Sequence, residues 1–126
     1  MKEEREDMNA RKLFYLGPQG TFTHQAAVSA SGLLRPVVPE GFDLIACDDV
    51  PQIMQAAQNG EGWGVIAWEN NVEGYVVPNL DALIDAQDLV GFARVGVNVE
   101  FDAYTLPDTG LEDAYVATAH SHGLAQ

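Results

Sequence analysis

Basic residues are scarce in this chain. Six Lys and Arg residues stand against 19 Asp and Glu residues, so the formal net charge at pH 7 is −13. Nucleic-acid binding depends on neutralising phosphates with Lys and Arg, and anionic membrane surfaces attract positive charge in the same way. We therefore expect neither as a partner. An anionic ligand would have to be held by local hydrogen-bond donors, because the overall field opposes it.

Cysteine and long apolar runs are also nearly absent. No run approaches the roughly 20 residues that cross a bilayer. Residues 1–7 are charged and lack the apolar segment of a secretion signal, so we expect a cytoplasmic protein with a frayed lead-in over 1–11. Cys47, the single cysteine, cannot form an internal disulfide, and the apolar run that contains it predicts a packed side chain.

Residues 12–88 have the pattern of repeated strand–helix units. Apolar runs predict strands at 13–16, 42–46 and 63–68, the last apolar on both faces. The predicted helices begin at Thr21 or Thr23, at Asp48 or Asp49, and near Pro78, the last with Leu80, Leu83 and Ile84 facing inward. This order predicts an α/β fold, a mostly parallel sheet with flanking helices and right-handed crossovers, with strand 63–68 in its middle.

The pattern changes near residue 89. Apolar residues alternate with polar residues or glycine at Val95, Val97, Val99 and Phe101. This alternation predicts a strand with one solvent-exposed face. Residues 115–118 predict a further short strand, and residues 120–126 predict the start of a helix. Because no partner lobe is visible for these strands, we expect exposed apolar surface around 95–101, which favours aggregation or dimerisation.

Two polar, glycine-bearing turns follow predicted strands, at 17–23 and 69–75. Each is either a plain turn or a ligand contact, and ligands of open α/β sheets collect at such strand ends. In the first turn, glycine permits close backbone approach, and the helix N-terminus offers N–H groups to a carboxylate or phosphate. Thr21 and Thr23 add hydroxyl donors. The spacing fits neither the dinucleotide fingerprint nor the P-loop.

Other polar residues near these turns are candidates for chemistry. In the second turn, Asn70 and Asn71 can donate and accept hydrogen bonds, and Glu69 or Glu73 would serve as a general acid if buried.

The histidines are weaker candidates for a metal site. His120 and His122 lack a carboxylate or cysteine at ligand spacing, so we expect no metal there and assign His120 a role as hydrogen-bond donor or proton carrier. His24 is expected to be a surface or packed residue.

Three segments resemble motifs of the prephenate dehydratases, in that family's order. They are residues 17–27, residues 69–74 and residues 120–126, and the resemblance spans about residues 12–126. It implies conversion of prephenate to phenylpyruvate, with loss of water and carbon dioxide, on the route to phenylalanine. It also implies that no metal or organic cofactor is used.

The same resemblance implies an organisation and a set of site residues. The fold would be two-lobed and similar to periplasmic binding proteins, with a first lobe over 12–88 and crossover strands entering an incomplete second lobe over 89–126. The implied catalytic residues are Glu69, Asn70, Asn71 and His120. The implied substrate-binding residues are Gly20, Thr21, Phe22, Thr23, Glu73 and Gly74.

Several features depart from the family pattern. Asn71 replaces a serine, and Ala119 and Ser121 replace serine and proline. The family's Thr-Arg-Phe motif and regulatory ACT domain are not within these residues and would be expected downstream of Gln126. We therefore expect an inactive part of a longer enzyme that is a homodimer or larger, or else a naturally short chain. Alternatives are a prephenate decarboxylase, which retains the hydroxyl, and a non-catalytic anion-binding or sensor module.

Overall fold

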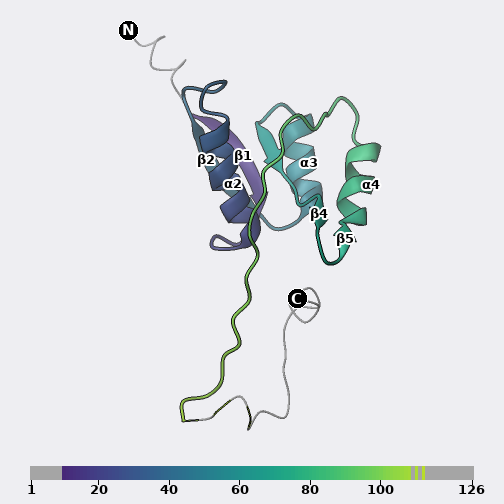
Figure 1. Ribbon diagram of the computed structural model, residues 1–126. Helices are drawn as coiled ribbons and strands as arrows, with labels where there is room; N and C mark the ends of the chain where they lie inside the picture. The colour runs from purple at the N-terminus through teal and green to yellow at the C-terminus, as the bar shows by residue number, and fades with distance from the viewer. Residues whose placement is uncertain (1–9, 109, 111, 113–126) are drawn as a thin grey trace.

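Three parallel strands form the sheet of the protein. The computed structural model describes residues 10–108, 110 and 112. Strands β1 (Arg11–Leu16), β2 (Phe42–Cys47) and β3 (Trp63–Val65) lie in the order β2-β1-β3, with Leu13 of β1 opposite both Leu44 and Trp63 (Figure 1). The expected parallel sheet with its flanking helices is confirmed.

The prediction for strand 63–68 was wrong in its length and position. In the described residues β3 ends at Val65 and lies at the edge of the sheet, while β1 lies in the middle. Residues 63–68 are apolar on both faces because they contact both cores, not because the strand is central. Trp63 and Val65 pack against the core on one face of the sheet, and Ile66 packs against the core on the other.

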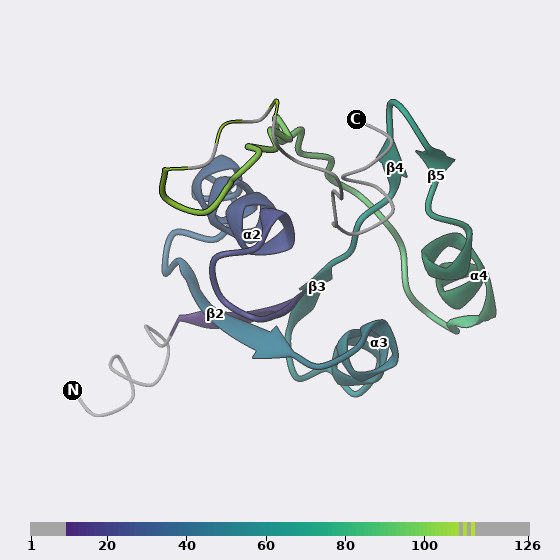
Figure 2. The ribbon, with the colours of Figure 1, turned by 90° about the horizontal axis from the view of Figure 1, so that it is seen from below.

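Two helices cover opposite faces of the sheet. Helix α2 (Phe22–Leu33) packs through Ala27 and Ala30 on one side, whereas α3 (Val50–Gln58) packs through Ile53 and Ala56 on the other (Figure 2). Successive side chains of a strand point to opposite faces, so β1 contributes to both cores. Its side chains in the α2 core are Leu13 and Tyr15, and in the α3 core they are Phe14 and the partly buried Leu16.

The helix starts resolve the two alternatives left by the sequence. Thr21, not Thr23, is the N-cap of α2 and accepts a hydrogen bond from the backbone N–H of His24. Asp49, not Asp48, is the N-cap of α3 and accepts from the N–H of Gln52 at 2.9 Å. Both caps satisfy backbone donors that have no partner inside the helix. None of the helices within the described ranges is long and apolar enough to cross a membrane.

Helix α4 (Val77–Asp85) packs against α3, but its predicted inner face was partly wrong. Ile84 is 77% exposed, Leu80 and Leu83 are half-buried, and Asn79 is the buried residue. At 3.6 residues per turn, Ile84 lies about 140° around the helix from Asn79. The helix is therefore rotated so that a polar side chain, which can bond to the backbone nearby, occupies the inner position.

The predicted strand over 95–101 is not formed. Its alternation is present, since Val95, Val97 and Val99 are half-buried and the residues between them are exposed. The segment makes side-chain contacts instead of a backbone ladder, with Val95 on the α2 core and Phe101 against the ring of Phe22. It continues away from the sheet as an extended chain (Figure 1).

The exposed apolar surface expected around 95–101 is found there only at Phe101, and the other large exposed apolar side chains of this region lie before and after that segment. They are Val90, Phe92, Tyr104 and Leu106. The predicted strand at 115–118 and the predicted helix start at 120–126 lie outside the described residues.

Candidate functional site

The strand order places the starts of the two segments that lead to the polar turns on neighbouring strands of the sheet. The chain runs from β1 through α2 to β2 on one side, then returns through α3 to β3 on the other side of β1. Such a reversal makes a topological switch point between β1 and β3, where open α/β sheets bind ligands at the carboxyl ends of the strands. The first turn leaves β1 at this end, and the chain that leads to the second turn leaves β3 there.

The threonine hydroxyls of the first turn are bonded inside the turn. Thr23 Oγ1 donates to the carbonyl oxygen of Leu16 at 2.6 Å. Thr21 Oγ1 lies 3.0 Å from both the carbonyl oxygen of Pro18 and Thr23 Oγ1, and it accepts from His24 N–H at 3.2 Å. Both hydroxyl protons thus have acceptors within the turn. The threonines shape the turn, and the expectation that their hydroxyls also donate to a ligand stays a prediction.

His24 holds the same turn from the helix side. The backbone N–H of Gly20 donates to His24 Nδ1 at 3.1 Å, so Nδ1 carries no proton in this arrangement and the ring N–H is on Nε2. The imidazole also lies against the ring of Tyr15, with 5.0 Å between ring centroids. His24 thereby connects the turn to the buried central strand.

The second turn is a short hairpin. Strands β4 (Glu69–Asn70) and β5 (Gly74–Tyr75) pair antiparallel, with Asn70 opposite Gly74. Asn70 Oδ1 accepts from the N–H of Val72 at 2.9 Å and from the N–H of Glu73 at 3.3 Å. This Asx turn fixes the Asn70 side chain.

The carboxylates of the hairpin do not meet the condition set for a general acid. Glu69 and Glu73 are both exposed, as is Asn71. The described residues bury neither carboxyl group.

Asn79 links the chain segments on the two sides of the hairpin. Its side chain is 9% exposed, and Nδ2 donates to the carbonyl oxygen of Ala67 at 2.9 Å. The N–H of Val76 donates to the carbonyl oxygen of Trp68 at 2.9 Å. These bonds hold the chain that leaves β3 against the start of α4, so the hairpin has a fixed base.

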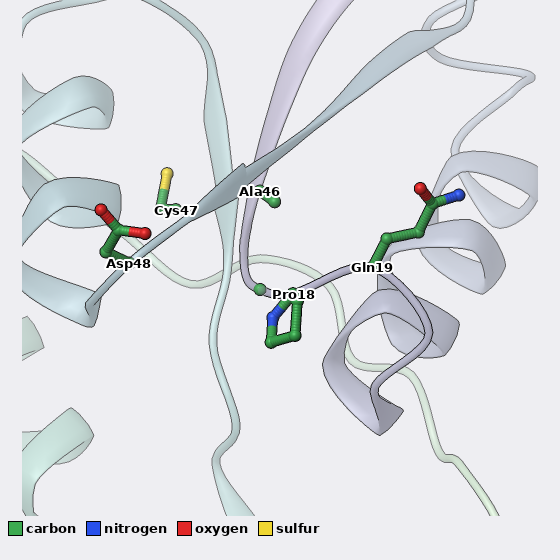
Figure 3. A pocket seen from close by; sticks show the side chains of 6 residues that line it. Pro18, Gln19, Ala46, Cys47 and Asp48 are labelled. Atoms are coloured by element: carbon green, nitrogen blue, oxygen red, sulfur yellow. The ribbon is translucent and has the colours of Figure 1, made fainter.

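A hollow of about 360 Å³ lies on the other side of β1, between the ends of β1 and β2. It is open to solvent and lined by Gly17, Pro18, Gln19, Ala46, Cys47 and Asp48. Figure 3 shows Cys47 and Asp48 on one side and Gln19 on the other, with Pro18 between them. The topology favours the switch point as the ligand site, because the hairpin residues do not line this hollow.

Cys47 should react slowly with alkylating agents. Its partial burial, followed by the charges of Asp48 and Asp49, raises the pKa of the thiol. A raised pKa means less thiolate at any pH below it, and the thiolate is the nucleophile. We expect iodoacetamide to modify Cys47 more slowly than an unstructured cysteine peptide at pH 8, with the rate still rising above that pH. Mass spectrometry measures both rates.

An Asp48→Asn variant is the control for this prediction. Removing the charge at Asp48 should lower the thiol pKa and speed alkylation modestly, without changing the burial of Cys47. A wild-type rate equal to that of the free peptide would contradict the prediction.

The predicted site residues thus fall into three groups. Gly20, Thr21, Phe22 and Thr23 lie in the first turn and the start of α2, and Glu69, Asn70, Asn71, Glu73 and Gly74 lie in the hairpin. His120 lies outside the described residues. Phe22 is 39% exposed and its ring lies 5.8 Å, centroid to centroid, from the ring of Phe101.

Sequence reasoning missed the roles of His24 and Asn79. The spacing Thr21-x-x-His24 is that of a capping box, with histidine in the usual place of Glu or Gln, and this was the available signal for His24. No local pattern marks Asn79 as buried. Among the described residues, no three His, Cys, Asp or Glu side chains come together in a way that would hold a metal ion.

A doubly wound α/β sheet with polar turns beside its switch point defines a class of protein that binds small molecules at the strand ends. Comparison with known proteins identifies the family within this class. The sequence model of the family described as "Prephenate dehydratase" matches residues 13–126. The chain belongs to the prephenate dehydratase family, a family of enzymes of the lyase kind.

Individual relatives agree with this family. The chain is 34% identical over 116 residues to a prephenate dehydratase of Amycolatopsis methanolica, covering 91% of this chain and 35% of that protein. It is 30% identical over 122 residues to one of Mycobacterium leprae, covering 94% of this chain and 38% of that protein. The chain therefore spans little more than a third of the length of these curated relatives.

A solved structure supports the fold. The prephenate dehydratase of Streptococcus mutans matches with a TM-score of 0.50 and 28% identity, covering 63% of this chain and 38% of that chain. This match confirms the predicted fold class, a mostly parallel α/β sheet with flanking helices as in periplasmic-binding-protein-like folds.

Proposed function

We propose that this chain forms one wall of a prephenate site and takes part in converting prephenate to phenylpyruvate. Family membership supports the reaction, and the observation that carries the site is the position of the two turns beside the switch point. In this proposal residues 12–88 form the first lobe, and residues 89–126 cross into a second lobe. A homodimer or larger assembly and a cytoplasmic location remain predictions.

The reaction sets clear demands on the protein. The ring carboxylate leaves as carbon dioxide, and its electron pair enters the ring as the C–O bond to the hydroxyl group breaks. The hydroxyl takes up one proton and leaves as water, so the ring becomes aromatic. A donor must supply that proton, and the carboxylate of the side chain must be held in place. Because aromatisation drives the reaction, positioning is the main task.

The start of α2 suits the carboxylate of the side chain. The N–H groups of His24 and Gln25 already bond to Thr21. We assign the N–H groups of Phe22 and Thr23, at the positive end of the helix, to the carboxylate. The hairpin residues Asn70 and Asn71 would face the other end of the substrate.

Proton donation to the leaving hydroxyl is assigned to a group outside the first turn. His120 is our candidate, and Glu69 would take this role only if another part of the site covers it. The exposure of Glu69 and Glu73 favours a second candidate function, a module that binds the anion without turnover.

Calorimetry with the full 126-residue chain tests the binding half of the proposal. We expect prephenate to bind and no phenylpyruvate to form, because the sequence lacks the Thr-Arg-Phe motif. Succinate, which has two carboxylates but no ring, is the control ligand and should bind more weakly. Failure to bind prephenate would contradict both candidate functions.

A chimaera decides between the candidates. The chain is joined to the part of the Amycolatopsis methanolica relative that it does not cover, and products are identified by mass spectrometry. Phenylpyruvate supports the dehydratase, and a non-aromatic hydroxylated product would indicate a decarboxylase instead. Prephenate binding with no product at all would favour the binding module.

A further inference from the structure

We propose that His24 is a positioning residue for the prephenate carboxylate, acting through the turn before α2 and not by touching the substrate. The proposal rests on the function proposed above. It starts from two reciprocal hydrogen bonds. His24 N–H donates to Thr21 Oγ1 at 3.2 Å, and Gly20 N–H donates to His24 Nδ1 at 3.1 Å.

This pair of bonds is a variant of the capping box. In the usual form, the Ser or Thr cap accepts from the third helical residue, whose Glu or Gln side chain accepts from the backbone of the cap. Here the cap is Thr21 and the third helical residue is His24. The imidazole accepts from Gly20, one residue before the cap, so it orders the peptide through which the chain enters the helix.

Side-chain packing does not restrain the turn at Gly20, although the threonine hydroxyls bond on either side of it. Gly20 has a φ of +95°, and a Cβ atom placed there would meet no heavy atom within 4 Å. Packing therefore does not fix the Gly20 backbone. The imidazole does have a rigid support, because it lies against Tyr15, which is 3% exposed in β1. Through its contact with Tyr15 and its bond to Gly20, His24 fixes the turn relative to the central strand.

The charge of the acceptor matters as much as its geometry. A glutamate at this position would make the same bond but would place a negative charge beside the helix N-terminus. An anionic substrate would then be repelled by the group that holds its binding turn. The first turn of α2 contains no acidic residue, although the chain as a whole carries a net charge of −13. A neutral imidazole satisfies the Gly20 N–H and leaves the positive end of the helix to the carboxylate.

Three substitutions separate these contributions. His24→Gln keeps a neutral acceptor, His24→Glu keeps an acceptor and adds charge, and His24→Leu removes the acceptor. For each variant of the 126-residue chain, NMR measures hydrogen exchange of the Gly20 amide, calorimetry measures prephenate affinity, and urea titration measures unfolding.

We expect the Gln variant to protect the Gly20 amide and to bind prephenate within about twofold of wild type. The Leu variant should lose that protection and bind about fivefold more weakly, the factor that one net hydrogen bond carries. The Glu variant should protect Gly20 as well as Gln does, yet bind more weakly than Gln. A merely structural role would not separate Glu from Gln in affinity at equal stability.

The outcomes distinguish the role of His24 from the proposed function on which it rests. A wild-type chain that does not bind prephenate contradicts the proposed function. Protection of the Gly20 amide from hydrogen exchange in the variants then shows whether His24 holds the turn. Equal protection of Gly20 in the Gln and Leu variants overturns the role of His24, whatever the ligand result. Equal affinity of the Leu variant and wild type also overturns it.

Discussion

Replacing Ile53 with alanine is expected to lower the free energy of unfolding by about 2–5 kcal/mol, the range for truncating a fully buried aliphatic side chain. Ile53 is 0% exposed and lies between α3 and the sheet, in one cluster with Phe14 and Ala56. The packing there is tight, since a Cβ atom on Gly64 would lie only 2.6 Å from Ile53 Cγ2. Urea unfolding followed by circular dichroism measures the loss.

Ile84→Ala is the matched control, because it truncates the same side chain in the same way at an exposed position instead of a buried one. Ile84 is 77% exposed on α4, so its truncation should change the unfolding free energy by no more than about 0.5 kcal/mol. Equal losses in the two variants would mean that the face of α4 carrying Ile84 is packed, contrary to the structure.

The substitution Gly62→Ala is expected to cost about 3 kcal/mol, the upper end of the range for overpacking. A Cβ atom at Gly62 would collide with the backbone carbonyl oxygen of Lys12 and lie 2.9 Å from Lys12 Cβ. The obstructing oxygen belongs to backbone next to the paired residues of β1 and β3 and cannot swing away. The two strands would have to separate at their amino ends, which lie at the opposite end of the sheet from the two polar turns.

Gly32→Ala is the control for this variant. Gly32 lies near the end of α2, and a Cβ atom there would meet no heavy atom within 4 Å. Alanine should leave the unfolding free energy unchanged or raise it by up to about 1 kcal/mol, because the unfolded chain loses freedom. If Gly62→Ala unfolds at the same urea concentration as wild type, then β3 does not pack against β1 as described.

Local sequence patterns correctly predicted those elements whose formation depends on one short segment of the chain. The apolar run before Gly17 predicted β1, and the apolar spacing from Val50 to Ala57 predicted α3. Thr21 and Asp49 were both among the predicted caps, because capping depends on residues within one turn of the chain. The choice between neighbouring candidates required the observed hydrogen bonds.

Predictions failed where distant segments decide the outcome. The alternation of 95–101 is satisfied by side-chain contacts with the α2 core, and a strand needs a backbone partner that no local pattern can supply. Likewise, the rotation of α4 depends on the carbonyl of Ala67, which lies 12 residues from Asn79 in the sequence.

The strand–helix order, the family motifs and the two turns at the ends of strands could all be read from the amino-acid sequence. These follow from short-range spacing and from the identity of adjacent residues. The central position of β1, the use of the threonine hydroxyls inside the turn, and the roles of His24 and Asn79 in holding the turns became apparent only from the folded chain. The physical reason is that a polar group takes whichever partner folding brings within about 3 Å, and sequence spacing does not specify that partner.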